Sequence, residues 1–116
     1  MIHVTYTISK DTVSLELTGH ACSAKYGHDL VCASASILCY TLASALESKY
    51  ECEELANKPS ITLSEGYARI ECIPHPQERR DILGAYELTV QGFELLSLRY
   101  PQYVELIKNV VSPERA

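Results

Sequence analysis

The spacing of apolar residues changes three times between two periods, and this constrains the fold more than any other feature. Residues 2–8 and 13–17 alternate between apolar and polar side chains, as half-buried β-strands do. Residues from about 30 to 50 then place apolar side chains three and four apart, which is typical of an amphipathic helix. The same order of two strands and a helix then repeats, with short strands near 61–63 and 68–72 and a helix from about 77 to 99. This order predicts an α+β two-layer sandwich, in which a four-stranded sheet carries two main helices on one face (ββ-α-ββ-α).

The connecting segments refine this prediction. Polar residues at 9–12 close the first hairpin, and the run Ser64-Glu65-Gly66 is a tight turn that closes the second. Residues 19–28 have no period and carry Gly19 and Gly27 near their ends, so we expect a mobile loop there. After Pro101, apolar residues three and four apart between 104 and 111 predict a last short helix.

Composition limits the kind of protein. The chain has 116 residues with 47% hydrophobic and 22% charged side chains, which predicts one globular domain spanning 1–116. No apolar run approaches about 18 residues, and no basic segment precedes an apolar one at the start, so we expect neither a membrane span nor a secretory signal. The formal net charge of −5 argues against direct nucleic-acid binding and suits a basic partner.

The five cysteines pose the main chemical question. Their odd number and the lack of a secretory signal argue against a disulfide framework. No C-x-x-C pair occurs and the histidines are not spaced like zinc ligands, so we expect neither a metal nor another cofactor. Cys39 and Cys72 fall on apolar faces and are predicted to be core thiols, while Cys52 has no evident role. Cys22, in the loop, is a possible rival nucleophile to Cys32.

Cys32 stands where a helix is expected to begin. With Asp29 as the N-cap residue, the Cys32 thiol would lie in the first helical turn, where unpaired amides and the helix dipole favour a thiolate. His20 follows the second strand, so a loop folding back could bring its imidazole to Cys32. The imidazole would then take the thiol proton and later protonate a leaving amine, while the helix amides stabilise an oxyanion.

Other interpretations of these residues remain open. A cysteine near a helix start is commonly a small buried apolar residue. Asp29 either caps the helix or holds His20 in one tautomer. Ser36, one turn after Cys32, either bonds the backbone or helps to orient a Cys–His pair.

A specific motif favours the catalytic interpretation. The sequence from Gly19 to Ser36 reads GHA, five residues, then GHDLVCASAS. It closely resembles the ribosomal-processing cysteine protease family, called Prp, whose members carry G-H-A, a variable loop ending Y-G-x-D, and [IL]-V-C-A with a serine four residues after the cysteine. The residues that carry the resemblance are Gly19, His20, Ala21, Tyr26, Gly27, Asp29, Leu30, Val31, Cys32, Ala33 and Ser36.

The resemblance implies a homodimeric endopeptidase of the bacterial cytoplasm that removes an N-terminal extension from large-subunit ribosomal protein twenty-seven. It implies Cys32 as the nucleophile, His20 as the general base, Asp29 and Ser36 as supporting residues, and a lid between Gly19 and Gly27. Two alternatives are retained. One is a non-catalytic ribosome-associated assembly or binding module of the same fold, and the other is a redox-responsive protein that uses Cys22 and Cys32.

Overall fold

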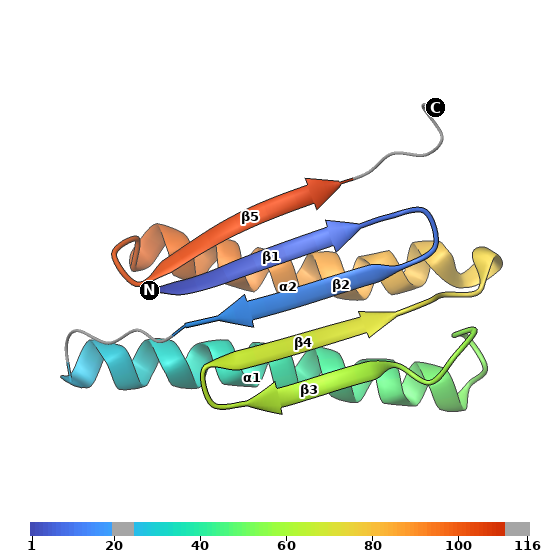
Figure 1. Ribbon diagram of the computed structural model, residues 1–116, viewed down its shortest axis with the longest axis horizontal. Helices are drawn as coiled ribbons and strands as arrows, with labels where there is room; N and C mark the ends of the chain where they lie inside the picture. Colours follow the sequence, from blue (N-terminus) through green and yellow to red (C-terminus); the bar gives the residue numbers. More distant parts are fainter. Residues whose placement is uncertain (20–24, 111–116) are drawn as a thin grey trace.

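The computed structural model describes residues 1–19 and 25–110, with residues 25–29 described by their backbone alone. Within them, five strands form one sheet in the order β3-β4-β2-β1-β5 (Figure 1). A short 3-10 segment, η1 (Pro76–Glu78), leads into the second helix. The remaining elements in chain order are β1 (Ile2–Ile8), β2 (Val13–Thr18), α1 (Lys25–Glu51), β3 (Ser60–Ser64), β4 (Tyr67–Cys72), α2 (Arg79–Arg99) and β5 (Val104–Val110).

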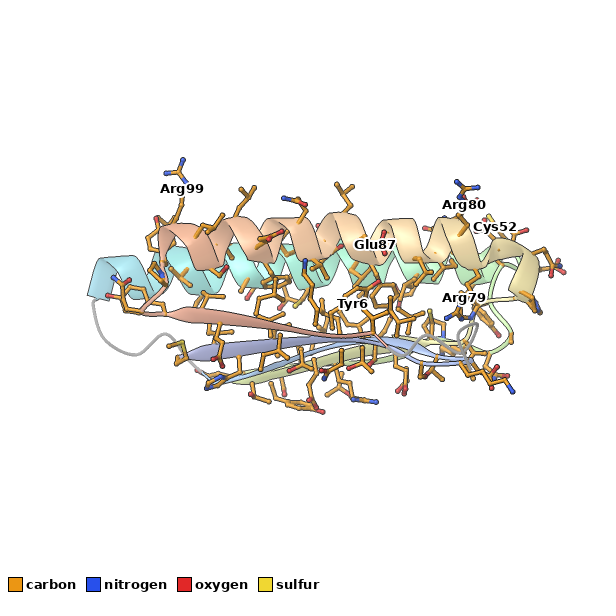
Figure 2. All side chains as sticks on the ribbon, turned by 90° about the horizontal axis from the view of Figure 1, so that it is seen from above. Tyr6, Cys52, Arg79, Arg80, Glu87 and Arg99 are labelled. Atoms are coloured by element: carbon orange, nitrogen blue, oxygen red, sulfur yellow. The ribbon has the colours of Figure 1, made fainter. Side chains whose placement is uncertain are left out.

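Both long helices lie on one face of the sheet, which confirms the predicted α+β two-layer architecture (Figure 2). The core fills the space between the layers. Each strand contributes alternate residues to it, and in β1 these are Ile2, Val4, Tyr6 and Ile8. The largest fully buried side chains are Tyr86 and Phe93, both from α2.

The opposite face of the sheet is polar. Arg69 on β4 reaches Glu16 on β2 at 3.8 Å and Glu71 on its own strand at 3.2 Å. His3 on β1 and Glu105 on β5 lie 2.7 Å apart between Nδ1 and Oε1. Polar and charged pairs of this kind suit a face exposed to water.

The prediction of four strands and a final short helix is wrong, because residues 104–110 form β5. This strand pairs in parallel with β1, from Ile2 opposite Val104 to Ile8 opposite Val110. The apolar residues at 104, 106 and 110 also fit a period of two, and so short a segment fits both periods. Residues 104–110 form a strand rather than a helix because the backbone donors and acceptors along the open edge of β1 need partners.

The start of α1 also differs from the prediction. The helix begins at Lys25 rather than near residue 30, so Asp29 lies within it and is not its N-cap. Gly27 lies within it too, so it does not end a loop. A helix once nucleated gains one hydrogen bond for each residue added, and this can outweigh the cost of about 1 kcal/mol for one internal glycine. Cys32 is consequently two turns inside α1, away from the unpaired amides of its first turn.

Two glycines fix where β2 ends. Gly19 has φ of 98° and Gly66, in the β3–β4 turn, has φ of 78°, a region that L side chains rarely adopt. The Gly19 amide donates to the Gly66 carbonyl oxygen at 3.0 Å. A Cβ added at Gly19 would collide with the carbonyl oxygen of Met1. The residue before His20 is therefore held against the β3–β4 turn.

The segment Leu30–Glu51 of α1 is long and apolar enough to cross a membrane by length and composition. Core helices of water-soluble folds pass the same criterion. In this structure Val31, Leu42 and Leu46 are at most 1% exposed and belong to the core cluster beneath the sheet. Packing between the two layers accounts for the apolar character of this face.

Candidate active site

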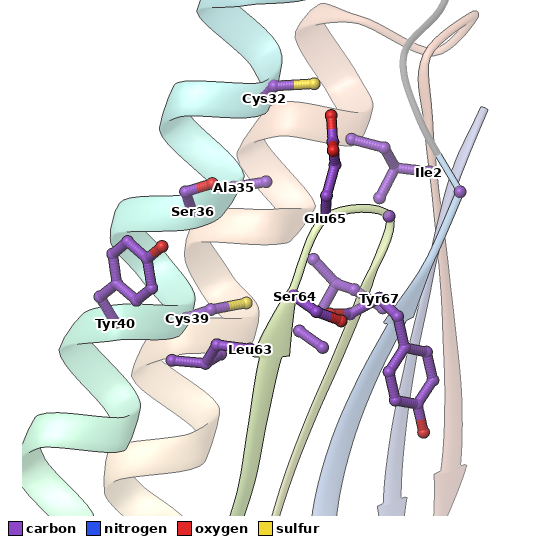
Figure 3. Close-up of a pocket in the computed structure, with 14 residues that line it drawn as sticks. Ile2, Cys32, Ala35, Ser36, Cys39, Tyr40, Leu63, Ser64, Glu65 and Tyr67 are labelled. Atoms are coloured by element: carbon purple, nitrogen blue, oxygen red, sulfur yellow. The ribbon is translucent and has the colours of Figure 1, made fainter.

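A cleft opens between α1 and the β3–β4 hairpin. Its volume is about 450 Å³, within the usual range for small-ligand and peptide side-chain pockets. The lining comes from one face of α1, from β3, β4 and their turn, and from the ends of β1 and β2. Figure 3 shows the α1 side chains facing the hairpin across this space.

Cys32 lies on the wall of this cleft. Its side chain is partly buried and packs against the core cluster. The sulfur points from α1 toward the sheet, at the same end of the cleft as the β3–β4 turn (Figure 3). The thiol is thus not sealed among hydrocarbon side chains, and a molecule bound in the cleft would meet it.

The structure brings Ser36 and Gly19 to the same cleft as Cys32. Ser36 is one helical turn further along α1 and exposed. Gly19 ends the segment that leads from β2 toward His20. His20 itself and Cys22 lie outside the described residues, and Asp29 is described by its backbone only, so their predicted roles stay predictions.

The remaining described thiols differ from Cys32. Cys39 also lines the cleft, but it is only 3% exposed, and burial raises its pKa to about 12. Burial likewise raises the pKa of Cys72, although a contact of 3.7 Å with the Tyr86 hydroxyl partly opposes this. Both therefore stay protonated at neutral pH, as predicted for core thiols. Cys52 is exposed at the end of α1, outside the cleft.

Two lining residues escaped the sequence interpretation. Tyr40 follows Cys32 and Ser36 at intervals of four, so helical spacing alone could have placed all three on one face. Glu65 was recognised only as a turn residue. No local pattern reveals that its turn lies against α1, because the packing of hairpin on helix is a tertiary contact.

One group of carboxylates lies elsewhere. Oxygen atoms of Glu54, Glu78 and Asp81 lie within 4.8 Å of one another, contributed by the loop after α1, by η1 and by the first turn of α2. Lys49 already approaches Glu54 at 3.4 Å. Partly exposed acidic groups of this kind are common without an ion, so among residues 1–19 and 30–110 this group makes no case for a metal centre.

A two-layer α+β domain with a partly accessible thiol on the wall of a cleft that mixes apolar and hydroxyl-bearing side chains has the features of a small thiol hydrolase. The sequence matches the family described as "Cysteine protease Prp" over residues 1–105. The chain therefore belongs to the cysteine protease Prp family.

Solved structures agree with this fold. SMU.848 from Streptococcus mutans is similar at a TM-score of 0.72 and 29% identity, over 96% of each chain. A ribosomal processing protease Prp from S. aureus, described as essential and bound covalently to a product peptide, is similar at a TM-score of 0.71 and 21% identity, over 94% of this chain and 100% of that one. The same protease with a substrate peptide gives a TM-score of 0.67 at 19% identity, again over 94% and 100%.

One curated protein shows a partial match. A manganese-dependent ADP-ribose/CDP-alcohol diphosphatase from Mus musculus is 32% identical over 69 residues, which is 60% of this chain. The match spans only 20% of that protein's length.

Proposed function

We propose that this chain is a cysteine endopeptidase that removes the N-terminal extension of large-subunit ribosomal protein twenty-seven in the bacterial cytoplasm. One observation carries the proposal: Cys32 and Gly19, the residue before His20, line the same cleft. Because Gly19 is held to Gly66 by its amide, the chain enters the segment containing His20 from the wall of the cleft. The family membership supplies the reaction class.

The chemistry assigns one role to each partner. His20 takes the proton of the Cys32 thiol, and the thiolate adds to the carbonyl carbon of the scissile peptide bond. The tetrahedral intermediate collapses, the C–N bond breaks, and the imidazolium returns its proton to the leaving amine. Water, deprotonated by the same imidazole, then cleaves the thioester and restores the thiol. Ser36 supports this step with its hydroxyl, one turn from the sulfur.

The source of thiol activation differs from the sequence-based expectation. Cys32 lies two turns inside α1, and its amide is part of the helix ladder. The helix N-terminus therefore supplies neither the field at the sulfur nor the oxyanion donors that were expected. The proposal assigns activation of the thiol to His20, with Asp29 as the candidate to orient it.

The net charge of the protein and the lining of the cleft support the proposed substrate. A protein with a formal net charge of −5 attracts a basic ribosomal protein over several ångströms. The apolar lining from Leu17, Ala35 and Leu63 suits apolar side chains of an extended peptide. We further propose a homodimer, for which three exposed leucines of α2 (Leu88, Leu95 and Leu98) provide an apolar surface.

The test uses the full chain and a peptide spanning the junction between extension and mature protein. Wild type and Cys52→Ser should cleave it, because Cys52 is exposed and lies outside the cleft. Cys32→Ser and His20→Ala should lose at least about a hundredfold in kcat/KM. His75→Ala is the matched histidine control.

The outcome also separates the alternatives. If wild type binds the peptide without cutting it, and Cys32→Ser binds equally, the chain is a binding module instead. If mild oxidant links Cys22 to Cys32 and no peptide is cut, the redox interpretation replaces the protease.

A further inference from the structure

Of the fourteen described residues that line the cleft, Glu65 alone has a charged side chain. The other lining residues are apolar, hydroxyl- or thiol-bearing, or glycine. A carboxylate among neutral side chains sets the sign of the local potential, because none of the described lining residues is a cation that offsets it. We propose that Glu65 selects a lysine or arginine side chain of the substrate close to the scissile bond, an inference that rests on the proposed peptidase function.

The position of Glu65 is fixed by its backbone. It follows β3 in the turn Ser64-Glu65-Gly66-Tyr67, which is closed by a 3.2 Å hydrogen bond from the Ser64 hydroxyl to the Tyr67 carbonyl oxygen. Gly66 takes the positive φ that such a turn requires at its third position. Its carbonyl oxygen also accepts the Gly19 amide. The turn is thus tied to β2 and presents Glu65 from a fixed base.

The carboxylate faces the thiol end of the cleft. In Figure 3 the Glu65 side chain extends from the turn toward the level of Cys32 on α1. Among the side chains that the structure describes, none forms an ion pair or hydrogen bond with it. Other carboxylates of the sheet, such as Glu16 and Glu71, are already engaged by Arg69. Within the described part of the chain, Glu65 therefore keeps its charge available for a ligand.

The exposure of Glu65 to solvent sets how strongly it can affect substrate selectivity. Glu65 is exposed, so an ion pair with substrate is worth a factor of about two to five, and salt screens it. Reversing the charge replaces attraction by repulsion and should change selectivity on the order of tenfold. A small energy still decides which peptide is cut first when substrates compete, since selectivity is a ratio of kcat/KM values.

The test measures kcat/KM for pairs of junction peptides that differ in one residue, which is lysine in one peptide and its neutral counterpart glutamine in the other. This residue is placed in turn at each of the three positions on either side of the scissile bond. Wild type should prefer the lysine peptide at one or more positions by about two- to fivefold. Glu65→Gln should abolish the preference by slowing only the lysine peptide. Glu65→Lys should invert it and favour a glutamate peptide at the same position.

Glu47→Gln is the matched control, because Glu47 is an exposed carboxylate near the far end of α1 and outside the cleft. It should keep the wild-type preference. Binding to the Cys32→Ser background, measured by fluorescence anisotropy at 50 and 300 mM salt, should show the same lysine preference only at the lower salt.

The inference is overturned if Glu65→Gln changes the cleavage rates of the lysine and glutamine peptides equally. The carboxylate would then act on the thiol or on the stability of the fold rather than on the substrate. It is also overturned if no lysine position distinguishes wild type from Glu65→Gln. Failure of the proposed function is different, because wild type would then cut neither peptide.

Discussion

The amide of Gly19 donates a 3.0 Å hydrogen bond to the carbonyl oxygen of Gly66, and this contact joins the end of β2 to the β3–β4 turn. It places the residue before His20 and the residue after Glu65 next to each other at the thiol end of the cleft. Two chain segments that are 47 residues apart, at Gly19 and Gly66, are thereby joined at one site by a backbone hydrogen bond.

Replacing Gly19 by alanine should damage both stability and activity. The positive φ and the collision with Met1 should cost on the order of 1–3 kcal/mol of the free energy of unfolding. Peptide cleavage should fall with it, because His20 would be displaced. Gly84→Ala is the control: no atom lies within 4 Å of its added Cβ, and within a helix it should stabilise by about 0.5–1 kcal/mol. Urea unfolding of both variants measures the difference, and equal stabilities would contradict it.

Two stacked tyrosines should respond oppositely to loss of their hydroxyls. Tyr6 and Tyr86 lie 6.0 Å apart between ring centroids. The Tyr86 hydroxyl donates to the Ile70 carbonyl oxygen at 3.0 Å, whereas the buried Tyr6 hydroxyl has no hydrogen-bond partner within the described part of the chain. Tyr86→Phe should therefore cost about 1–2 kcal/mol, and Tyr6→Phe should be neutral or stabilising by up to about 1 kcal/mol. A Tyr6→Phe variant that is the less stable of the two would refute this.

Alkylation should rank the thiols by environment. The pKa of Cys39 is raised from 9.0 to about 12, so its thiolate fraction at pH 7.5 is roughly a thousandfold below that of an ordinary thiol. Peptide mapping after iodoacetamide should show exposed Cys52 modified and Cys39 spared, with Cys39 reacting faster as the pH approaches its pKa. Both should react alike in denaturant.

The same experiment tests the Cys–His pair. Cys32 should react faster than Cys52 in the wild-type protein and lose that advantage in His20→Ala. Retention of the advantage without His20 would assign thiol activation to another group.

The proposed dimer should depend on the exposed leucines of α2. Leu88, Leu95 and Leu98 are 76%, 55% and 72% exposed. Their exposure is consistent with the side of α2 that turns away from the sheet, where Figure 2 shows Arg80 and Arg99. Sedimentation should give a dimer for wild type and a monomer for Leu88→Gln/Leu95→Gln. Ile37→Gln, at an apolar position of α1 that is 59% exposed, should remain dimeric. Dissociation by Ile37→Gln alone would move the interface to α1.

Strict periodicity made most of the fold predictable. Strands β1 to β4 and helix α2 lie where the alternation and the apolar stripe predicted them, because each spans enough residues to exclude the other period. β5 was misread because its identity depends on the open edge of β1, about a hundred residues earlier. The start of α1 was misplaced because Asp29 is a good cap and Gly27 a poor helix former, yet helix propagation overrode both local preferences.

In the candidate site, too, residues within a local motif were predictable, and features that depend on tertiary structure were not. Cys32 and Ser36 were found from a local motif, and the structure places both on the cleft wall. The reason given for the reactivity of Cys32, a position in the first turn, was wrong because it relied on a helix boundary. Glu65 could not have been found, since only tertiary packing brings its turn to α1.

The parallel pairing of β1 with β5 has a consequence during synthesis. One edge of β1 bonds to β5, about a hundred residues later in the chain, so that edge stays open until residues 104–110 have been synthesised. Nascent chains should be prone to edge-to-edge association at this point, and chaperones that cover extended segments should favour the yield of folded protein.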